Sequence, residues 1–293
     1  MSPTSIPATL EDIARPSGGL AMVAMDQRES LRHMFDLAGA GRPGDQVLVD
    51  FKVAVAEQLG PLASGFLIDR HYGFGEVRAV LPRATGLVLA VDALAQEPGG
   101  PVEDTDLDQA ALAMDLAGVS ALKLLLIWRR DARRADRVEL ARRFIELARA
   151  RGLLSVLEPV VRPAPDEHDF DAEAAIREAA RELSPLGPSL YKVQVPRAGE
   201  GSDRELQAAC DALAGDITGP WVVLSQGVQR ENFLRAVTAA CRAGGSGFLA
   251  GRALWSDVVG TRDVVRRLRV TSRPRLERLA EVVDREARPW TQV

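Results

Sequence analysis

The feature that most constrains the fold is a regular alternation of apolar strand-like runs with amphipathic helical stretches along the chain. Eight short apolar runs have the length of buried strands, at positions 20–26, 64–69, 85–92, 121–128, 153–160, 189–196, 221–227 and 245–251. Between them, positions 45–59, 135–150 and 204–214 show helical patterns. Ser202 and Glu205 form the sequence pattern of a capping box before the last of these.

Eight β-then-α units within one chain of this length predict an α/β fold, a single (β/α)8 TIM barrel. A doubly wound open sheet is the alternative, but its usual glycine-rich turn after the first strand is replaced here by Asp26-Gln27-Arg28. The segments 97–102 and 163–171 read as loops within the alternation. We therefore expect one domain over residues 1–293, with a short N-terminal extension at 1–11 and a C-terminal helix at about 271–293 covering the barrel edge.

Composition excludes several classes of partner. The net charge is −4 and the arginines are interspersed with acidic residues, which argues against nucleic-acid binding. No apolar stretch approaches the roughly 20 residues of a membrane span, and the first 15 residues lack the apolar core of a signal peptide. Cys210 and Cys241 fall on apolar helix faces, which predicts reduced thiols and a cytoplasmic protein.

Lysine is unusually scarce. Only three of the 37 Lys and Arg residues are lysines: Lys52, Lys123 and Lys192. Arginine stays charged and is a poor nucleophile, whereas a desolvated lysine can attack a carbonyl as a free amine. Lys123 and Lys192 lie within predicted buried strands and are the stronger candidates for chemistry. Lys52 lies on a predicted helix and receives less weight.

The active site of such a barrel lies at the carboxyl ends of its strands. Strand alternation places Lys192 inward, near the end of the sixth strand. Lys123, on the fourth strand, can approach it across the fifth, which carries Glu158. A carboxylate between two amines suits the proton transfers of imine chemistry, and a second ammonium favours a neutral lysine. A plain ion pair between Glu158 and Lys123 is the alternative, and it needs the same geometry.

Anion-binding groups are expected at the same rim. The seventh and eighth strands end in Ser225-Gln226-Gly227 and Gly251-Arg252, where barrels commonly bind phosphate, and Arg28 follows the neighbouring first strand. Arg28 and Arg252 together imply an anionic substrate, unless both are solvated rim charges. The three histidines have no spacing typical of metal ligands, so we expect neither metal nor cofactor.

Six segments, at positions 21–30, 121–129, 157–163, 190–193, 221–225 and 245–253, resemble the class I aldolases that include tagatose-1,6-bisphosphate aldolase and sulfofructosephosphate aldolase. The segment 12–19, the Asp50-Phe51-Lys52 run and Trp128 resemble the sulfofructosephosphate branch. The run Asp69-Arg-His-Tyr-Gly73 departs from the Asp-Pro-Glu-Tyr-Gly of the tagatose branch, which puts any substrate contact made there in doubt.

The resemblance implies a lyase that cleaves 6-deoxy-6-sulfofructose 1-phosphate, a sulfosugar phosphate of sulfoquinovose catabolism (sulfoglycolysis). The products are dihydroxyacetone phosphate and 3-sulfolactaldehyde. It implies that Lys192 forms a Schiff base with the carbon-2 ketone and that Glu158 moves protons. It further implies that Asp26 and Lys123 orient the substrate hydroxyls, and that the chain forms a homo-oligomer.

Because the phosphate adjoins the imine carbon, the resemblance assigns it to four residues at the ends of strands seven and eight: Ser225, Gly227, Gly251 and Arg252. Gln27 and Arg28 then become the candidates for the distal sulfonate. Three alternatives remain open: a tagatose-1,6-bisphosphate or related ketose bisphosphate aldolase, a sulfofructose transaldolase, and a phosphosugar-binding regulatory barrel without catalysis.

Overall fold

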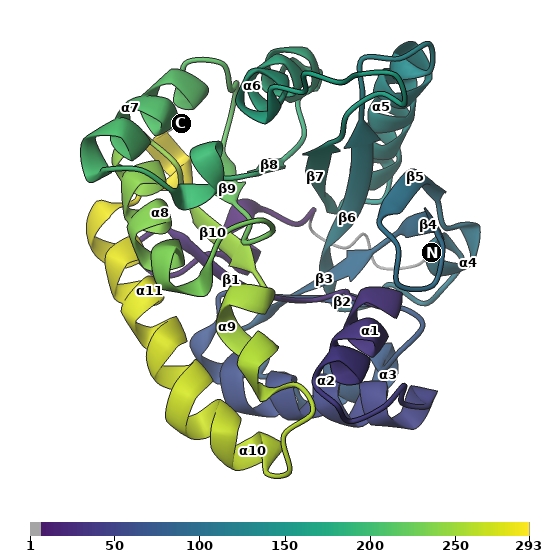
Figure 1. Ribbon diagram of the computed structural model, residues 1–293. Coiled ribbons are helices and arrows are strands. Elements are labelled where there is room, and N and C mark those ends of the chain that lie inside the picture. Colours follow the sequence, from purple (N-terminus) through teal and green to yellow (C-terminus); the bar gives the residue numbers. More distant parts are fainter. Residues whose placement is uncertain (1–6, 293) are drawn as a thin grey trace.

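Eight parallel strands close into a barrel in the computed structural model, which describes residues 7–292 (Figure 1). Around the barrel the strands follow the order β1, β10, β9, β8, β7, β6, β3, β2. Their bounds are β1 Leu20–Met25, β2 Gly65–Asp69, β3 Gly86–Ala90, β6 Val119–Trp128, β7 Leu154–Val161, β8 Leu190–Val193, β9 Trp221–Val223 and β10 Gly247–Ala250. The predicted TIM barrel is confirmed.

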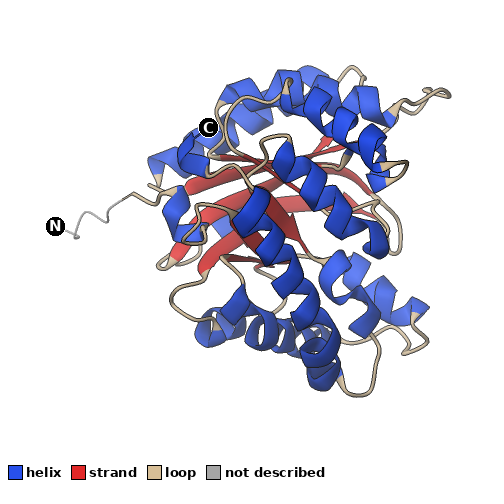
Figure 2. Cartoon of the chain, turned by 90° about the vertical axis from the view of Figure 1, so that its left-hand side faces the viewer, coloured by secondary structure: helices blue, strands red, loops and turns tan. Residues whose placement is uncertain are grey.

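Helices surround the strands on the outside (Figure 2). They are α1 Glu29–Leu37, α2 Asp45–Leu59, α3 Phe74–Val80, α4 Gln109–Leu112, α5 Arg134–Ala150, α6 Ala172–Leu183, α7 Asp203–Ala214, α8 Arg230–Arg242, α9 Arg252–Trp255, α10 Val264–Arg267 and α11 Arg273–Glu286. Short 3₁₀ turns cover Leu10–Ile13, Gly60–Leu62, Ser184–Leu186, Pro196–Gly199, Ser256–Val258 and Trp290–Gln292. None of these described helices is both long and apolar enough to cross a membrane.

The predicted capping box is present at the start of α7. The Ser202 hydroxyl accepts a hydrogen bond from the Glu205 amide (3.3 Å), and the Glu205 carboxylate accepts one from the Ser202 amide (2.8 Å). Two amides that the first helical turn cannot pair are thereby satisfied, which fixes where the helix begins.

The alternation of side chains along each strand builds two apolar layers. On β1, Leu20, Met22 and Ala24 face the barrel interior, while the residues between them pack against the helices. The same period of two leads, at five of the eight strands, from an apolar interior residue to a charged one nearer the carboxyl end. These pairs are Ala24 and Asp26, Ala90 and Asp92, Ala121 and Lys123, Val156 and Glu158, and Leu190 and Lys192. The sequence thus places a ring of charged groups directly above an apolar core.

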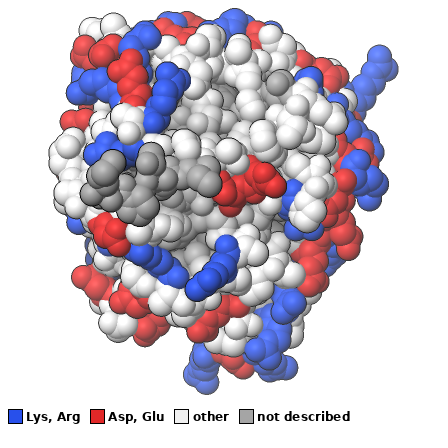
Figure 3. Space-filling view, turned by 180° about the vertical axis from the view of Figure 1, so that it is seen from behind, with Lys and Arg blue, Asp and Glu red and all other residues white. Residues whose placement is uncertain are grey.

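The amino-terminal ends of the strands are closed by the chain termini. Leu10 and Ile13 are buried within the barrel interior, and Trp290 packs against the same cluster. Gly86 permits this approach, because a Cβ there would lie 2.2 Å from the Asp12 carbonyl oxygen. The expected extension at 1–11 is therefore wrong in part: Leu10 belongs to the core, while residues 1–6 lie outside the described residues. Seen from behind, basic and acidic side chains are interspersed among uncharged ones over the surface (Figure 3).

An antiparallel hairpin interrupts the alternation after β3. It consists of β4 (Asp92–Gln96) and β5 (Val102–Leu107), paired from Asp92 opposite Leu107. The sequence interpretation assigned Asp92 to the third strand and 97–102 to a loop, so it missed the hairpin. β5 (Val-Glu-Asp-Thr-Asp-Leu) is acidic and only partly buried, which hides the signal of a buried strand.

The C-terminal segment is also more divided than predicted. Helix α10 and a π-helical turn at Leu268–Ser272 lead into α11, which ends at Glu286 rather than continuing to the terminus. Helix α11 contacts α8 and α2 on the outside of the barrel (Figure 1).

Candidate active site

A pocket of about 210 Å³ opens at the carboxyl ends of the barrel strands. Its lining includes most of the residues that the sequence singled out: Asp26, Gln27, Arg28, Lys123, Glu158, Lys192, Ser225, Gly251 and Arg252. Gly227 does not line it. Asp92, Arg162 and the hairpin residues Leu94, Gln96 and Val102 complete much of the wall.

Lys123 is enclosed by three carboxylates. Its ammonium lies 2.7 Å from Asp26 Oδ2, 3.0 Å from Asp92 Oδ2 and 2.8 Å from Glu158 Oε2, and its side chain is 1% exposed. Burial would lower the pKa of Lys123, but the three carboxylates outweigh it and hold the pKa well above the ordinary value. Lys123 is therefore a permanent cation.

Lys192 contacts one carboxylate. Its ammonium lies 2.8 Å from Glu158 Oε1, so the Glu158 carboxylate bridges the two lysines. The register explains this: Lys123 is opposite Val156 on β7, and Val156 is opposite Leu190 on β8. Two residues further along each strand, Glu158 and Lys192 point to the same side of the sheet as Val156 and Leu190, at the level of the pocket.

Asp26 and Asp92 complete the charged group. Burial alone would raise the pKa of Asp26, but the charges of Lys123 and Lys192 and the hydrogen bond from Lys123 hold it well below its ordinary value. Asp92 Oδ2 also accepts the amide of Leu125 (3.1 Å), which fixes the carboxylate to β6. Asp26 therefore stays ionised beside Lys123, and Asp92 contacts the same ammonium.

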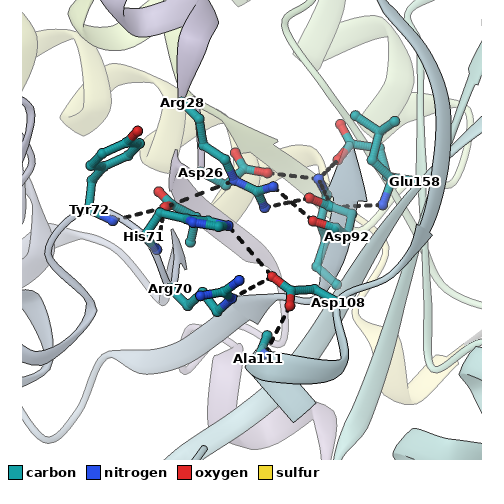
Figure 4. Close-up of polar contacts among 12 residues, drawn as sticks. Asp26, Arg28, Arg70, His71, Tyr72, Asp92, Asp108, Ala111 and Glu158 are labelled. Atoms are coloured by element: carbon teal, nitrogen blue, oxygen red, sulfur yellow. Dashed lines mark hydrogen bonds and ion pairs between the residues drawn. The ribbon is translucent and has the colours of Figure 1, made fainter. Parts of the chain in front are cut away.

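Arg28 does not extend into the pocket as a free cation. Its Nη1 donates to the Asp92 carbonyl oxygen (2.8 Å) and its Nη2 to Asp92 Oδ1 (2.7 Å), as Figure 4 shows. Its Nε lies 4.0 Å from Asp69 Oδ1. The expectation that Arg28 meets a second anion stays a prediction: Arg28 lines the pocket, but both of its terminal nitrogens are already paired with Asp92. The Gln27 side-chain oxygen is buried without a hydrogen-bond partner.

Arg162 and Arg252 are the pocket arginines that no carboxylate pairs within the described residues. Burial and then the charge of Arg162 lower the pKa of Arg252, while Glu158 and Asp26 act in the opposite sense from beyond contact distance. The Arg162 Nε is buried without a hydrogen-bond partner. The sequence analysis missed Arg162, although it directly follows β7 and so occupies the same kind of rim position as Arg252.

The two glycines expected at the phosphate site differ in their surroundings. At Gly251 a Cβ would lie 2.4 Å from the Ala24 carbonyl oxygen, so only glycine allows β1 and the start of α9 to approach each other. Gly227 is exposed, with φ +82° and open space around it, which is typical of a turn. Ser225 is 7% exposed and lines the pocket.

Metal ligands are not assembled here. Within residues 7–292, no group of three or more His, Cys, Asp or Glu side chains is arranged to hold a metal ion. The carboxylates that do converge, from Asp26, Asp92 and Glu158, enclose the Lys123 ammonium.

Comparison with known proteins identifies the family. The model of the DeoC/LacD family aldolases matches residues 20–257, most of the chain. The chain belongs to this family. It is an aldolase, and aldolases are lyases.

Individual relatives agree with this family. The chain is 29% identical to a protein named tagatose 1,6-diphosphate aldolase from Listeria monocytogenes, over 96% of this chain and 92% of that one. It is 26% identical to tagatose 1,6-diphosphate aldolase 2 from Streptococcus mutans, over 97% and 95% of the two chains.

Solved structures show the same fold. Fructose-bisphosphate aldolase from Plasmodium falciparum superimposes with a TM-score of 0.72 at 15% identity, covering 98% of both chains. An archaeal fructose-1,6-bisphosphate aldolase, solved with its catalytic lysine bound to a carbinolamine intermediate, gives a TM-score of 0.56 at 16% identity, covering 93% of this chain and 96% of that one.

Proposed function

We propose that this aldolase is a class I enzyme in which Lys192 forms the Schiff base. The observation that carries the proposal is the Lys192–Glu158–Lys123 arrangement, with both lysine contacts at 2.8 Å. Lys123 is held protonated by three carboxylates and cannot serve as the nucleophile. Lys192 contacts a single carboxylate, that of Glu158, which is placed to accept its proton.

The reaction then follows from what each group can do. The Lys192 amine attacks the carbon-2 ketone, Glu158 moves the protons that release water, and an iminium forms. The bond between carbons 3 and 4 breaks as the carbon-4 hydroxyl loses its proton, and its electrons pass into the iminium as an enamine. Protonation of carbon 3 and hydrolysis release dihydroxyacetone phosphate and free Lys192. Asp26 and Lys123 lie where they can orient the substrate hydroxyls.

The substrate proposed is 6-deoxy-6-sulfofructose 1-phosphate, which carries an anion at each end and yields 3-sulfolactaldehyde as the second product. The phosphate lies next to the imine carbon, and Ser225, Gly251 and Arg252 line the neighbouring wall. Because Arg28 is already paired, Arg162 is the guanidinium left for the sulfonate, which accepts hydrogen bonds and donates none. Gln27 lines the same pocket, and its side-chain NH2 group can donate a further hydrogen bond to the sulfonate.

A second candidate is tagatose-1,6-bisphosphate aldolase, favoured by the names of the curated relatives. Both candidates share the imine chemistry and differ in the distal anion. A terminal phosphate can carry two negative charges, whereas a sulfonate carries one. The curated relatives are below 30% identical, which leaves room for a change of substrate.

The test combines trapping with product analysis. Borohydride reduction with dihydroxyacetone phosphate is expected to add the reduced ketone to the peptide containing Lys192, and Lys192→Arg is expected to be as inactive as Lys192→Ala. Label on Lys123, or no label, would contradict the mechanism. Incubation with the sulfosugar phosphate, tagatose 1,6-bisphosphate and fructose 1,6-bisphosphate side by side identifies the substrate, and faster cleavage of a bisphosphate would reject the sulfosugar.

A further inference from the structure

All three lysines of the chain belong to one connected group of buried charges. Lys52, on α2, is 0% exposed, and its ammonium contacts the Asp69 carboxylate at the end of β2. The Tyr72 ring lies over the same ammonium, 5.5 Å from ring centroid to nitrogen. The function proposed above uses Lys123 and Lys192 and assigns nothing to Lys52. A fully buried charge so near an active site calls for a reason.

Asp69 is held rigidly at the end of β2. Its Oδ1 accepts the backbone amides of His71 (2.8 Å) and Tyr72 (3.0 Å), and its Oδ2 contacts Lys52. In Figure 4 the backbone nitrogen of Tyr72 faces the charged group while its ring points away, and the His71 ring points toward Asp108. Because both oxygens are engaged, Asp69 remains close to Arg28 without a hydrogen bond to it.

Arg28 thus lies between two carboxylates and hydrogen-bonds only one. Its Nε is buried and unpaired at 4.0 Å from Asp69, while both terminal nitrogens bind Asp92. Each of these carboxylates contacts one lysine, but both oxygens of Asp69 are engaged by Lys52 and two backbone amides, whereas Asp92 Oδ1 is left for Arg28. The Lys52 ammonium neutralises the Asp69 carboxylate, so Arg28 hydrogen-bonds Asp92 instead. Asp92 in turn contacts Lys123 with its other oxygen (3.0 Å).

We propose that Lys52 is a positioning residue for the aldolase reaction: by neutralising Asp69 it keeps Arg28 on Asp92, and so holds Lys123 beside Glu158 and Lys192. The inference rests on the imine mechanism proposed above. Lys52 is fully buried, and a compact ammonium needs less buried space than the wider guanidinium fork. Lysine at position 52 therefore has a reason in a chain that otherwise uses arginine.

The charge balance of the group gives the proposal a measurable consequence. The charged groups that face Lys192 in the pocket are Asp26, Arg28, Asp92, Lys123, Glu158, Arg162 and Arg252. Those around Lys52 are Asp69, Asp26, Arg28 and Arg32, with Tyr72. Burial lowers the pKa of Lys52 and Asp69 opposes this shift, so the ammonium depends on its partner.

The experiment measures the pH dependence of imine trapping by borohydride with dihydroxyacetone phosphate, on full-length variants whose folding is checked by circular dichroism. Lys52→Met removes a positive charge, so Lys192 keeps its proton to higher pH. The acidic limb of the profile is expected to move up by roughly half a pH unit to one unit. The kcat for the sugar phosphate is expected to fall about tenfold, with a smaller change in KM, because a displaced Lys123 affects the chemical step rather than substrate binding.

Two further variants separate positioning from mere stability. Asp69→Asn keeps an oxygen for the His71 and Tyr72 amides but removes the negative charge. The acidic limb of its pH profile is therefore expected at or below the pH of the wild-type limb. The double variant Lys52→Met with Asp69→Asn is expected to return the limb to the wild-type position. A structural role alone predicts weaker folding in each variant and no such compensation.

Arg15→Met is the matched control, because it breaks an ion pair with Asp284 (2.7 Å) that lies away from the pocket. It is expected to lower stability without moving the limb. Where Lys52→Met does not fold, Lys52→Gln keeps a donor for Asp69 without the charge and gives the same readout. If neither Lys52 variant folds, the pH profiles of Asp69→Asn and of the double variant decide. An acidic limb at higher pH than in the wild type overturns the proposal, and limbs at the expected positions support it. An unmoved limb in a folded Lys52 variant also overturns it, whereas absence of trapping in the wild type rejects the proposed function instead.

Discussion

At the scale of single residues, the two strand lysines differ in how many carboxylates surround them. Lys123 has three within 3.0 Å and Lys192 has one. In the mechanism proposed above, this difference makes Lys123 a fixed charge and Lys192 the nucleophile, although both lie in similar apolar strands. Sequence pattern alone distinguished Lys123 from Lys192 only by their positions in the strands.

The arginines allow a prediction of the same kind. Arg162→Ala is expected to lower kcat/KM for the sulfosugar phosphate by roughly thirty- to several-thousand-fold, because it removes a charged partner from a desolvated anion. Imine trapping with dihydroxyacetone phosphate, which lacks the distal anion, is expected to change little. Steady-state kinetics and borohydride trapping measure the two effects.

Two other variants complete that comparison. Arg252→Ala is expected to weaken both cleavage and trapping, because this residue lines the wall proposed for the phosphate. Arg130→Ala is the control, since Arg130 is already paired with Glu167 and Glu178 outside the pocket lining. Equal losses from Arg162→Ala in cleavage and trapping would contradict the division of the two anion sites.

At the scale of elements, the start of α7 is the clearest case in which sequence predicts structure. Ser202→Ala removes the hydroxyl that accepts the Glu205 amide and is expected to cost about 1 kcal/mol of unfolding free energy. Urea unfolding measures this loss. The rate of cleavage should stay unchanged, because α7 does not line the pocket. A slower reaction in a fully folded Ser202→Ala protein would show that α7 affects the active site.

The hairpin β4–β5 is the opposite case. Its strands alternate between buried and exposed positions over only five and six residues, and β5 carries three acidic side chains. Such a segment is stabilised by pairing with its partner strand and by contacts such as that between Arg133 and Asp104, which join it to the start of α5. These contacts are distant in sequence, so local pattern does not reveal them.

At the scale of the whole molecule, the buried charged group links stability to pH. The pKa of Asp26 is depressed in the folded protein, so its contribution is present above its unfolded pKa of about 3.9 and is lost as the pH falls further. The pKa of Lys123 is raised, so its contribution is fully present below about 10.4 and is lost as the pH rises through the folded pKa. We expect a plateau of unfolding free energy between these limits, as far as these two groups determine it.

Asp26→Asn tests the acid side of this plateau. The variant is expected to be less stable than the wild type at pH 7, and the difference is expected to shrink below pH 4 by up to about 1.4 kcal/mol per pH unit. Urea unfolding from pH 3 to pH 7 measures both curves. Parallel curves throughout would mean that Asp26 titrates in the folded protein as it does in the unfolded chain.

The sequence by itself determined the barrel, most strand positions and the candidate residues at the strand ends. Periodicity suffices for this, because a period of two decides which side chains face inward, and eight β-then-α units close in one way. It also singled out the lysines, since a chain that writes other cations as arginine keeps lysine at few positions.

Only the tertiary structure decided how these groups are paired. Arg28, Asp92 and Asp69 come from three different strand ends, and their distances follow from barrel closure rather than from any local pattern. Barrel closure also decides which residues contact Lys52, and it leaves Arg162 without a carboxylate partner within the described residues. Electrostatic roles depend on separations of a few ångströms between residues far apart in the chain, and sequence spacing does not fix those separations.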